Sequence, residues 1–197
     1  MLKKEECVLY SGGAKGAEQE FGAQAETYGI EEVNFTFEGH GTVRTRGLRV
    51  LSAEELKSGD VSLAYVSNLM HRTYTDAMFI RKVLQTLWYQ VNAGQEVYVI
   101  GKILEDGTVR GGTGWGAEFA KICNKPIFVF DQDKNAWFAW AETRWMEVVD
   151  PGNLRIGHPR FTGTGTRFLE ENGRKAIQDL FRRSFKYATS GLLSSGR

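Results

Sequence analysis

The sequence has almost no net charge and few of the residues that build metal sites or disulfides. Its formal charge is +1 at pH 7, so it lacks the global basic field by which many proteins bind nucleic acid. The two cysteines, Cys7 and Cys123, both adjoin apolar segments, a setting that favours buried, reduced thiols over a disulfide. The three histidines show no metal-ligand spacing. We therefore expect neither a metal site nor a nucleic-acid partner.

Long hydrophobic runs are also missing. No apolar stretch reaches the roughly 20 residues that a membrane-spanning helix needs, and residues 1–6 are charged, unlike a secretory signal peptide. We therefore expect no membrane contact and a cytoplasmic protein. The length of 197 residues predicts a single domain, which we place at residues 1–186. Serine and glycine mark residues 187–197, which we expect to form a mobile tail.

Short apolar runs alternate with helix signals along the rest of the chain. Strands are predicted at residues 7–10, 33–37, 61–66, 96–103 and 126–130. Residues 52–55, S-A-E-E, form a capping box, and residues 75–92 carry apolar positions at helical spacing, with Thr75 and Asp76 as candidate caps. Two tryptophan-rich segments, 136–140 and 144–149, predict a small antiparallel addition, and a last helix is predicted at 168–185. The alternation predicts an α/β, Rossmann-like, doubly wound and mainly parallel sheet.

The most informative stretch is G-G-T-G-W-G-A-E at residues 111–118, between an apolar run and a predicted helix. A glycine turn that opens a helix presents free backbone N–H groups, and the helix dipole favours an anion there. Trp115 is a candidate to stack on a base, or else a core residue. Glu118, about one turn into the helix, could contact a sugar hydroxyl or act as an acid or base. The predicted ligand-binding residues are Arg110, Gly111, Gly112, Thr113, Gly114 and Trp115.

Two more glycine loops lead into predicted helices. In a parallel sheet, such loops meet at the carboxyl ends of the strands, where ligands bind in this class of fold. Arg167 is an attractive phosphate contact because its guanidinium group is planar and bidentate. The predicted ligand-binding residues are Ser11, Gly12, Gly13, Ala14, Lys15 and Gly16 in the first loop, and Gly163, Thr164, Gly165, Thr166 and Arg167 in the last.

Residues 110–118 resemble the P-G-G-x-G-T-x-x-E motif of the LOG-type phosphoribohydrolases, also called the lysine decarboxylase-like family. Arg110 and Trp115 replace the proline and the threonine of that motif. Residues 78–82, M-F-I-R-K, resemble the family's M-x-x-R-K element. The resemblance implies that Arg81 and Glu118 form a catalytic pair that cleaves the N-glycosidic bond of a nucleoside monophosphate, without a metal or other cofactor.

Residues 11–18 are similar to the G-G-A-x-G-A-D loop of the DprA-like and YAcAr-type branches of the wider SLOG superfamily. Residues 162–167 resemble the G-x-R loop that opens those domains, although here this loop comes last. The motif order leads to the hypothesis that the chain is circularly permuted relative to that superfamily. Its C-terminal strand and helix would then occupy the usual first position, and a place at a sheet edge, far from the other two loops, would rule the hypothesis out.

Three functions stay open on the sequence alone. The leading one is binding of a nucleotide, an NAD-derived molecule or a pterin, as a sensor, carrier or enzyme. The alternative is the N-glycosidase reaction, and a weaker alternative is single-stranded DNA binding like that of DprA. We also expect a homo-oligomer, with the helix at residues 75–92 and the tryptophan-rich strands as candidate surfaces.

Overall fold

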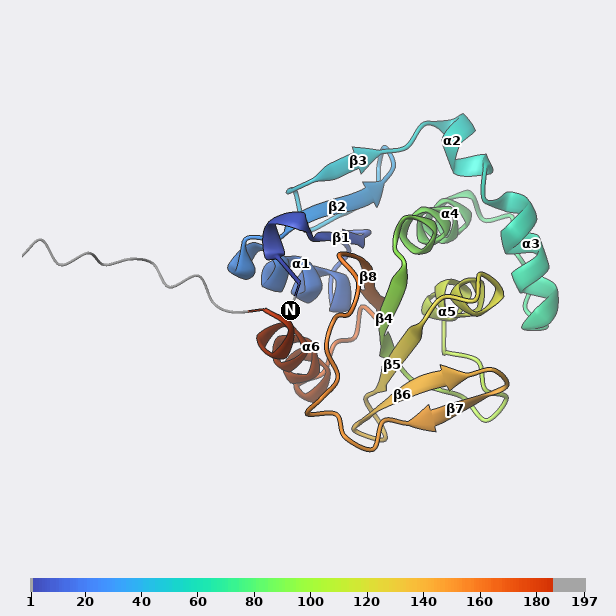
Figure 1. The fold of residues 1–197 in the computed structure, drawn as a ribbon. Coiled ribbons are helices and arrows are strands. Elements are labelled where there is room, and N and C mark those ends of the chain that lie inside the picture. Colours follow the sequence, from blue (N-terminus) through green and yellow to red (C-terminus); the bar gives the residue numbers. More distant parts are fainter. Residues whose placement is uncertain (1, 186–197) are drawn as a thin grey trace, which may run out of the picture.

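Eight strands form one sheet in the order β3-β2-β1-β8-β4-β5-β6-β7 (Figure 1). The structure, a computed structural model, describes residues 2–185. The strands are β1 (Val8–Ser11), β2 (Glu31–Thr36), β3 (Leu48–Val50), β4 (Glu96–Gly101), β5 (Ile127–Asp131), β6 (Ala136–Ala141), β7 (Arg144–Glu147) and β8 (Arg160–Gly165). The helices are η1 (Lys4–Glu6), α1 (Ala17–Tyr28), α2 (Ala53–Lys57), α3 (Asp60–Leu69), α4 (Met78–Ala93), α5 (Thr113–Ile122) and α6 (Glu171–Ser184).

The strand directions confirm the predicted fold class. The six strands from β3 to β5 in the sheet order pair in parallel. Strands β6 and β7 add an antiparallel hairpin at one edge, as the tryptophan-rich segments predicted. The protein is therefore an α/β, Rossmann-like structure with a small antiparallel addition.

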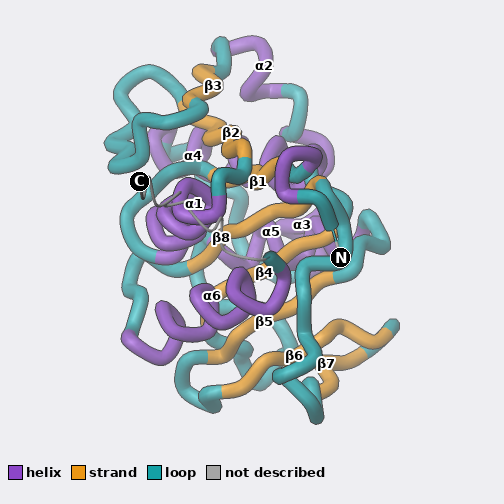
Figure 2. The backbone as a smooth tube through the Cα atoms, turned by 60° about the vertical axis from the view of Figure 1, so that its left-hand side comes forward, coloured by secondary structure: helices purple, strands orange, loops and turns teal. Residues whose placement is uncertain are grey.

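Helices cover both faces of the sheet, and each face has its own apolar core. On one face α1 and α6 pack against each other and, through Phe21 and Leu180, against strand residues such as Phe161. On the other face α3, α4 and α5 bury Leu63 and Leu87 against the strands. Figure 2 shows α1 and α6 in front of the strands and α3 and α5 behind them. This two-sided covering explains why β4 and β5 are apolar along most of their length.

Strand β8 lies in the middle of the sheet although it comes last in the chain. It pairs in parallel with β1 on one side and with β4 on the other. Its residues Phe161, Thr162, Gly163 and Thr164 are all buried. A sheet-edge position for this segment would have contradicted the permutation hypothesis, and β8 does not lie at an edge.

Three local predictions need correction. Residues 61–66 belong to helix α3, not to a strand. The apolar run at 61–66 resembles a buried strand, because Leu63 and Val66 face the core while Val61 and Tyr65 are exposed but also apolar. Neither Thr75 nor Asp76 caps α4, which begins at Met78 after Ala77 without a side-chain cap. The last helix begins only at Glu171, after a loop that Gln132 holds by hydrogen bonds to the carbonyl of Phe168 (3.2 Å) and the N–H of Glu170 (2.8 Å).

The capping box at the start of α2 is confirmed. Ser52 accepts a hydrogen bond from the N–H of Glu55, whose carboxylate in turn accepts one from the N–H of Ser52. The predicted tail at 187–197 lies outside the described residues. Between residues 2 and 185, no helix has both the length and the apolar character needed to cross a membrane.

Candidate functional site

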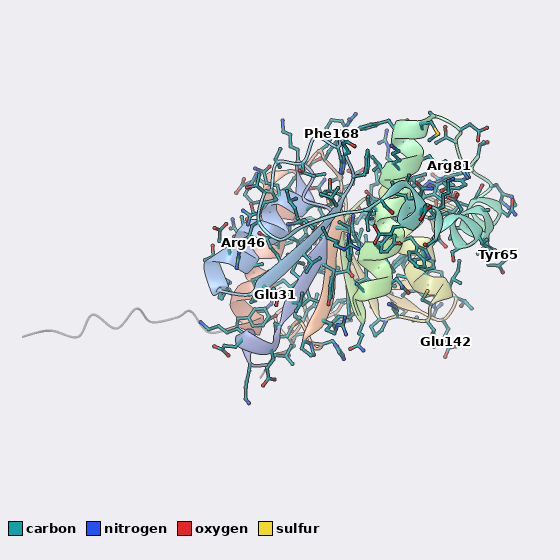
Figure 3. All side chains as sticks on the ribbon, turned by 90° about the horizontal axis from the view of Figure 1, so that it is seen from above. Glu31, Arg46, Tyr65, Arg81, Glu142 and Phe168 are labelled. Atoms are coloured by element: carbon teal, nitrogen blue, oxygen red, sulfur yellow. The ribbon has the colours of Figure 1, made fainter. Side chains whose placement is uncertain are left out.

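The carboxyl ends of the parallel strands form the edge of the sheet at which the predicted loops emerge. The chain leaves β1 through α1 toward β2 on one side, and leaves β4 through α5 toward β5 on the other. Such a divergence is a topological switch point, where a crevice opens between neighbouring loops. In Figure 3, Phe168 and Arg81 lie toward this edge, whereas Glu142, in the turn between β6 and β7, lies toward the opposite edge.

The structure brings the first and last glycine loops into contact. The N–H of Ala17 donates to the carbonyl of Thr166 (3.0 Å). A Cβ on Gly16 would lie only 2.5 Å from the Cα of Arg167, and Gly16 has φ +99°, so only glycine fits there. Under the loops, the hydroxyl of Ser11 donates to the carbonyl of Gly163 (2.7 Å). Ser11, Gly12, Gly13, Gly163 and Thr164 are buried, so the accessible part of this pair of loops is Ala14–Gly16 and 165–168.

A buried carboxylate, Glu18, ties these loops to the sheet. It accepts hydrogen bonds from the N–H of Ala14 (3.0 Å) and from the hydroxyl of Thr164 (2.8 Å). Burial raises the pKa of Glu18, and hydrogen bonds from its neighbours, including Gln90, oppose that rise. The sequence analysis assigned Glu18 no role. The sequence contained a signal for such a role, because Glu18 follows Gly12 at the same spacing at which Glu118, a predicted site residue, follows Gly112.

Two buried acceptor atoms next to the first loop have no hydrogen-bond partner within the described chain. They are the side-chain oxygens of Asn34 and Gln90. A Cβ on Gly13 would lie 3.2 Å from Cγ of Asn34, and one on Gly12 would lie 2.5 Å from Nε2 of Gln90, so both amides adjoin the loop. Buried acceptors are rarely left unpaired in native proteins. Each of the two oxygens can therefore accept a hydrogen bond from a buried water molecule.

Cationic and aromatic side chains line the exposed rim of the same loops. Lys15 and Arg167 are exposed, and no salt bridge to another residue within 2–185 engages either one. The guanidinium of Arg167 lies 4.8 Å from the ring centroid of Phe168, which is 70% exposed. The N–H groups of Lys15 and Gly16 donate to no other residue in this part of the chain. Phe168 was not predicted, because an isolated phenylalanine after a glycine loop carries no sequence signal of exposure.

The third glycine loop opens α5 after β4, the other neighbour of β8. Arg110, Gly111 and Gly112 are exposed, and Gly111 has φ +73°. Arg72, which the sequence analysis missed, fixes this loop by donating to the carbonyl of Val109 (3.0 Å). Thr113 and Gly114 begin the helix, and Gly114 is buried.

Trp115 is a core residue in this structure. Its side chain is 5% exposed, and its ring centroid lies 5.4 Å from that of Tyr74. It belongs to the apolar cluster beneath α4 and α5. Of the two alternatives that the sequence left open, base stacking and core packing, the structure shows the second.

Glu118 and Arg81 each have partners of their own. Glu118 pairs with Lys121 (2.6 Å), and the Lys121 ammonium lies 3.7 Å from the ring centroid of Trp140 in the β6–β7 hairpin. Burial lowers the pKa of Lys121. Arg81 instead pairs with Asp60 (3.4 Å) and Asp76 (3.3 Å), and lines a cavity of about 360 Å³ at the start of α4. Within residues 2–185, no hydrogen bond or ion pair joins Arg81 to Glu118.

The cysteines and histidines contribute no site of their own. Cys7 and Cys123 are free thiols, and burial raises the pKa of Cys7 to about 11. A thiol with a raised pKa is a poor nucleophile and a poor metal ligand at neutral pH. In the region from residue 2 to 185, no three His, Cys, Asp or Glu side chains gather in a way that could hold a metal ion.

Comparison with known proteins adds support for the fold. No model of a protein family matches the sequence, and no curated protein matches it significantly. Among solved structures, the chain is similar to the "putative molybdenum carrier protein" of Syntrophus aciditrophicus SB. The TM-score is 0.54 at 15% sequence identity, and the match covers 91% of this chain and 94% of that chain. At this identity the likeness shows a shared fold, which agrees with the Rossmann-like α/β architecture of this chain.

Proposed function

We propose that this protein binds a small anionic ligand at the carboxyl edge of β1 and β8 and serves as its carrier or sensor. The first candidate is a nucleotide or a nucleotide-derived molecule. The observation that carries the proposal is the contact between residues 12–16 and 165–168. This contact sets the exposed Lys15 and Arg167 beside N–H groups at the start of α1 that donate to no other described residue.

The chemistry of these groups defines the ligand class. Backbone N–H groups at a helix start and the helix dipole favour phosphate or another oxyanion. The guanidinium of Arg167 can donate two parallel hydrogen bonds to such a group. Glu18 engages the N–H of Ala14, on the inner side of the loop, and leaves those of Lys15 and Gly16 for a ligand. The exposed ring of Phe168 offers a stacking surface for a base or a pterin.

Two resemblances support the carrier or sensor role over others. Residues 11–18 and 162–167 are similar to the ligand loops of the SLOG superfamily, which favours a nucleotide-like ligand. The Syntrophus protein of similar fold is described as a carrier. The N-glycosidase alternative has less support, because Glu118 pairs with Lys121 and Arg81 pairs with Asp60 and Asp76. DNA binding also has less support, because the net charge is +1.

A ligand screen tests the proposal. Purified protein is incubated with nucleoside mono-, di- and triphosphates, NAD, ADP-ribose, phosphate and molybdate. Thermal unfolding then reports binding, and mass spectrometry reports the fate of each compound. We expect saturable stabilisation by at least one compound that is recovered intact. Release of a free base that the Glu118→Gln variant loses would instead establish the glycosidase. No stabilisation by any compound would contradict the proposal.

Substitutions at the rim locate the site. Arg167→Ala and Lys15→Ala should each weaken binding of the stabilising compound roughly tenfold to hundredfold, because each removes a charge-assisted hydrogen bond. Lys175→Ala is the matched control, since Lys175 is also exposed but lies on α6 and forms no salt bridge within the described chain. Titration calorimetry measures the affinities. Equal affinities for all four proteins would show that the ligand binds elsewhere.

A further inference from the structure

Phe168 is an exposed aromatic residue at the rim of the candidate site. Its side chain is 70% exposed, and its ring lies beside the guanidinium of Arg167, which is exposed as well. Figure 3 shows Phe168 at the margin of the molecule. Because so little packing surrounds this ring, its position depends on how the backbone of residues 166–170 is held. We call these five residues the rim segment.

The start of the rim segment is anchored through Thr166 to β4 and α1. The N–H of Thr166 donates to the carbonyl of Ile100 (2.8 Å), and the carbonyl of Thr166 accepts a hydrogen bond from the N–H of Ala17 (3.0 Å). The hydroxyl of Thr166 also accepts one from the N–H of Phe168 (3.1 Å). These bonds fix the backbone on both sides of Arg167 and place that residue beside the start of α1.

The end of the rim segment is held by Gln132, which follows β5. The amide Nε2 of Gln132 donates to the carbonyl of Phe168 (3.2 Å), and its Oε1 accepts a hydrogen bond from the N–H of Glu170 (2.8 Å). The amide orientation follows from these partners, because a carbonyl requires a donor and an N–H an acceptor. One side chain therefore fixes the two peptide groups that flank Leu169.

Gln132 itself stands on a well-fixed turn. Its side chain is buried, and its N–H donates to the carbonyl of Gly101 (3.1 Å). The buried carboxylate of Asp131 accepts hydrogen bonds from the N–H groups of Ile103 and Asp133 (both 3.0 Å). A Cβ on Gly173 would collide with Oε1 of Gln132, so the first turn of α6 encloses the amide closely. The amide is therefore a rigid support for the rim segment.

We infer that Gln132 is the positioning residue for Phe168 and thereby sets the preference of the site for ligands that carry a base or another flat ring. This inference rests on the proposed function. Stacking on an aromatic side chain requires that its ring is correctly placed. An oxyanion held by Arg167 and by backbone N–H groups does not need that ring. Loss of the Gln132 amide should therefore weaken the binding of the ring and spare the binding of the oxyanion.

Titration calorimetry on the full chain compares the wild type with Gln132→Met, which keeps the side-chain size and removes both hydrogen bonds. The probes are AMP, ADP-ribose and NAD, which carry a base, and ribose 5-phosphate and inorganic phosphate, which do not. We expect Gln132→Met to bind the base-bearing probes roughly tenfold more weakly, and the base-free probes within about twofold of the wild type. Phe168→Ala should show the same pattern, and Gln132→Met should add nothing to it in the double variant.

Gln85→Met is the matched control, because Gln85 is also buried and its amide donates to Asp60 (2.7 Å) instead of the rim segment. It should bind all probes like the wild type. Gln132→Glu is a milder second variant, should Gln132→Met not fold, because it keeps an acceptor for Glu170 and loses the donor to Phe168. Its added charge weakens every anionic probe, so the ratio of the affinities for AMP and ribose 5-phosphate reports the effect on the ring.

The outcomes separate this inference from the proposed function. If neither these probes nor the compounds of the ligand screen bind, the proposed function fails and the inference fails with it. If the wild type binds the base-free probes at least as tightly as every base-bearing probe, the proposed function stands and the inference is overturned, because the ring of Phe168 then contributes nothing. Equal losses of affinity for both classes of probe in Gln132→Met also overturn it.

Discussion

Glu18 shows how a single buried side chain can organise a loop. Its two carboxylate oxygens join Ala14 of the loop to Thr164 of the central strand. Every group that approaches it within hydrogen-bonding distance is a donor, which stabilises the ionised form. Burial opposes this and raises the pKa of Glu18 above its ordinary value of 4.5. The competition between these effects makes the residue a source of pH-dependent stability.

Glu18→Gln should therefore change the pH dependence of the free energy of unfolding. Between pH 4.5 and the raised pKa of Glu18, the folded protein holds a proton that the unfolded chain has released. The free energy of unfolding of the wild type thus falls as the pH rises through this interval. The variant has no titrating group at this position, so its free energy of unfolding should lack that fall. Urea unfolding at a series of pH values measures both proteins.

Glu38→Gln serves as the control for the Glu18 experiment, because Glu38 is exposed. Its stability should follow the wild type at every pH. Parallel stability curves for the wild type and Glu18→Gln between about pH 4 and 8 would show that burial does not raise the pKa of Glu18.

At the residue scale, the sequence predicted where the glycine loops lie, but not which aromatic side chains near them are buried and which are exposed. Glycine and helix signals placed residues 12–16 and 111–114 correctly, because positive φ and a helix start are local properties. The burial of Trp115 and the exposure of Phe168 depend on neighbours distant in the sequence. Periodicity carries no information about such neighbours, so these two residues could not be assigned from the sequence.

The enclosed position of β8 in the centre of the sheet restricts which residues its sequence can contain. It is enclosed by β1, β4 and helices on both faces, and Gly163 lies against Phe21 of α1. A Cβ on Gly163 would lie 2.5 Å from Cγ of Phe21 and 3.0 Å from Cδ1 of Leu9. Gly163, which the sequence analysis placed in a ligand-binding loop, is therefore required for close packing between α1 and the sheet.

Gly163→Ala should destabilise the protein by about 1–3 kcal/mol, the usual effect of overpacking a core. Gly41→Ala is the control, because no atom lies within 4 Å of a Cβ at Gly41 and its φ is not positive. That variant should unfold at the wild-type denaturant concentration. Guanidinium unfolding measures both, and equal midpoints for the two variants would contradict the close approach of Phe21.

Helix α3 shows where element prediction fails for a physical reason. A run that is apolar at nearly every position has no clear period, so strand and helix cannot be separated by pattern alone. The structure resolves the ambiguity through tertiary packing on α4 and α5.

At the scale of the whole molecule, the order of elements in the chain differs from their order in the sheet. The alternation of strands and helices was enough to predict the α/β class, because parallel sheets require crossovers. The motif order led to the permutation hypothesis, which excluded a sheet edge for the last strand, and β8 lies between β1 and β4 rather than at an edge. The pairing itself could not be derived, because local sequence does not encode which strands become neighbours.

If the last strand and helix form an ordinary Rossmann-like unit that has moved along the chain, a permuted chain should fold. Leu2 packs on the same apolar cluster as Phe185, and Figure 1 shows the N-terminus beside the end of α6. Joining residue 197 to residue 1 and opening the chain between Val149 and Asp150 would make β8 the first strand. Both residues are exposed, and the turn from Asp150 to Asn153 stays intact.

We expect the permuted chain to unfold cooperatively with a free energy within a few kcal/mol of the wild type, because every strand pair and both cores are retained. A chain that ends at Val149 should not fold, because it leaves β1 and β4 without their shared neighbour and removes Phe161, Ile177 and Leu180 from the core. Circular dichroism and urea unfolding compare the three chains. A folded truncation would show that β8 is dispensable. An unfolded permutant would show that the native chain order is itself needed to assemble the sheet.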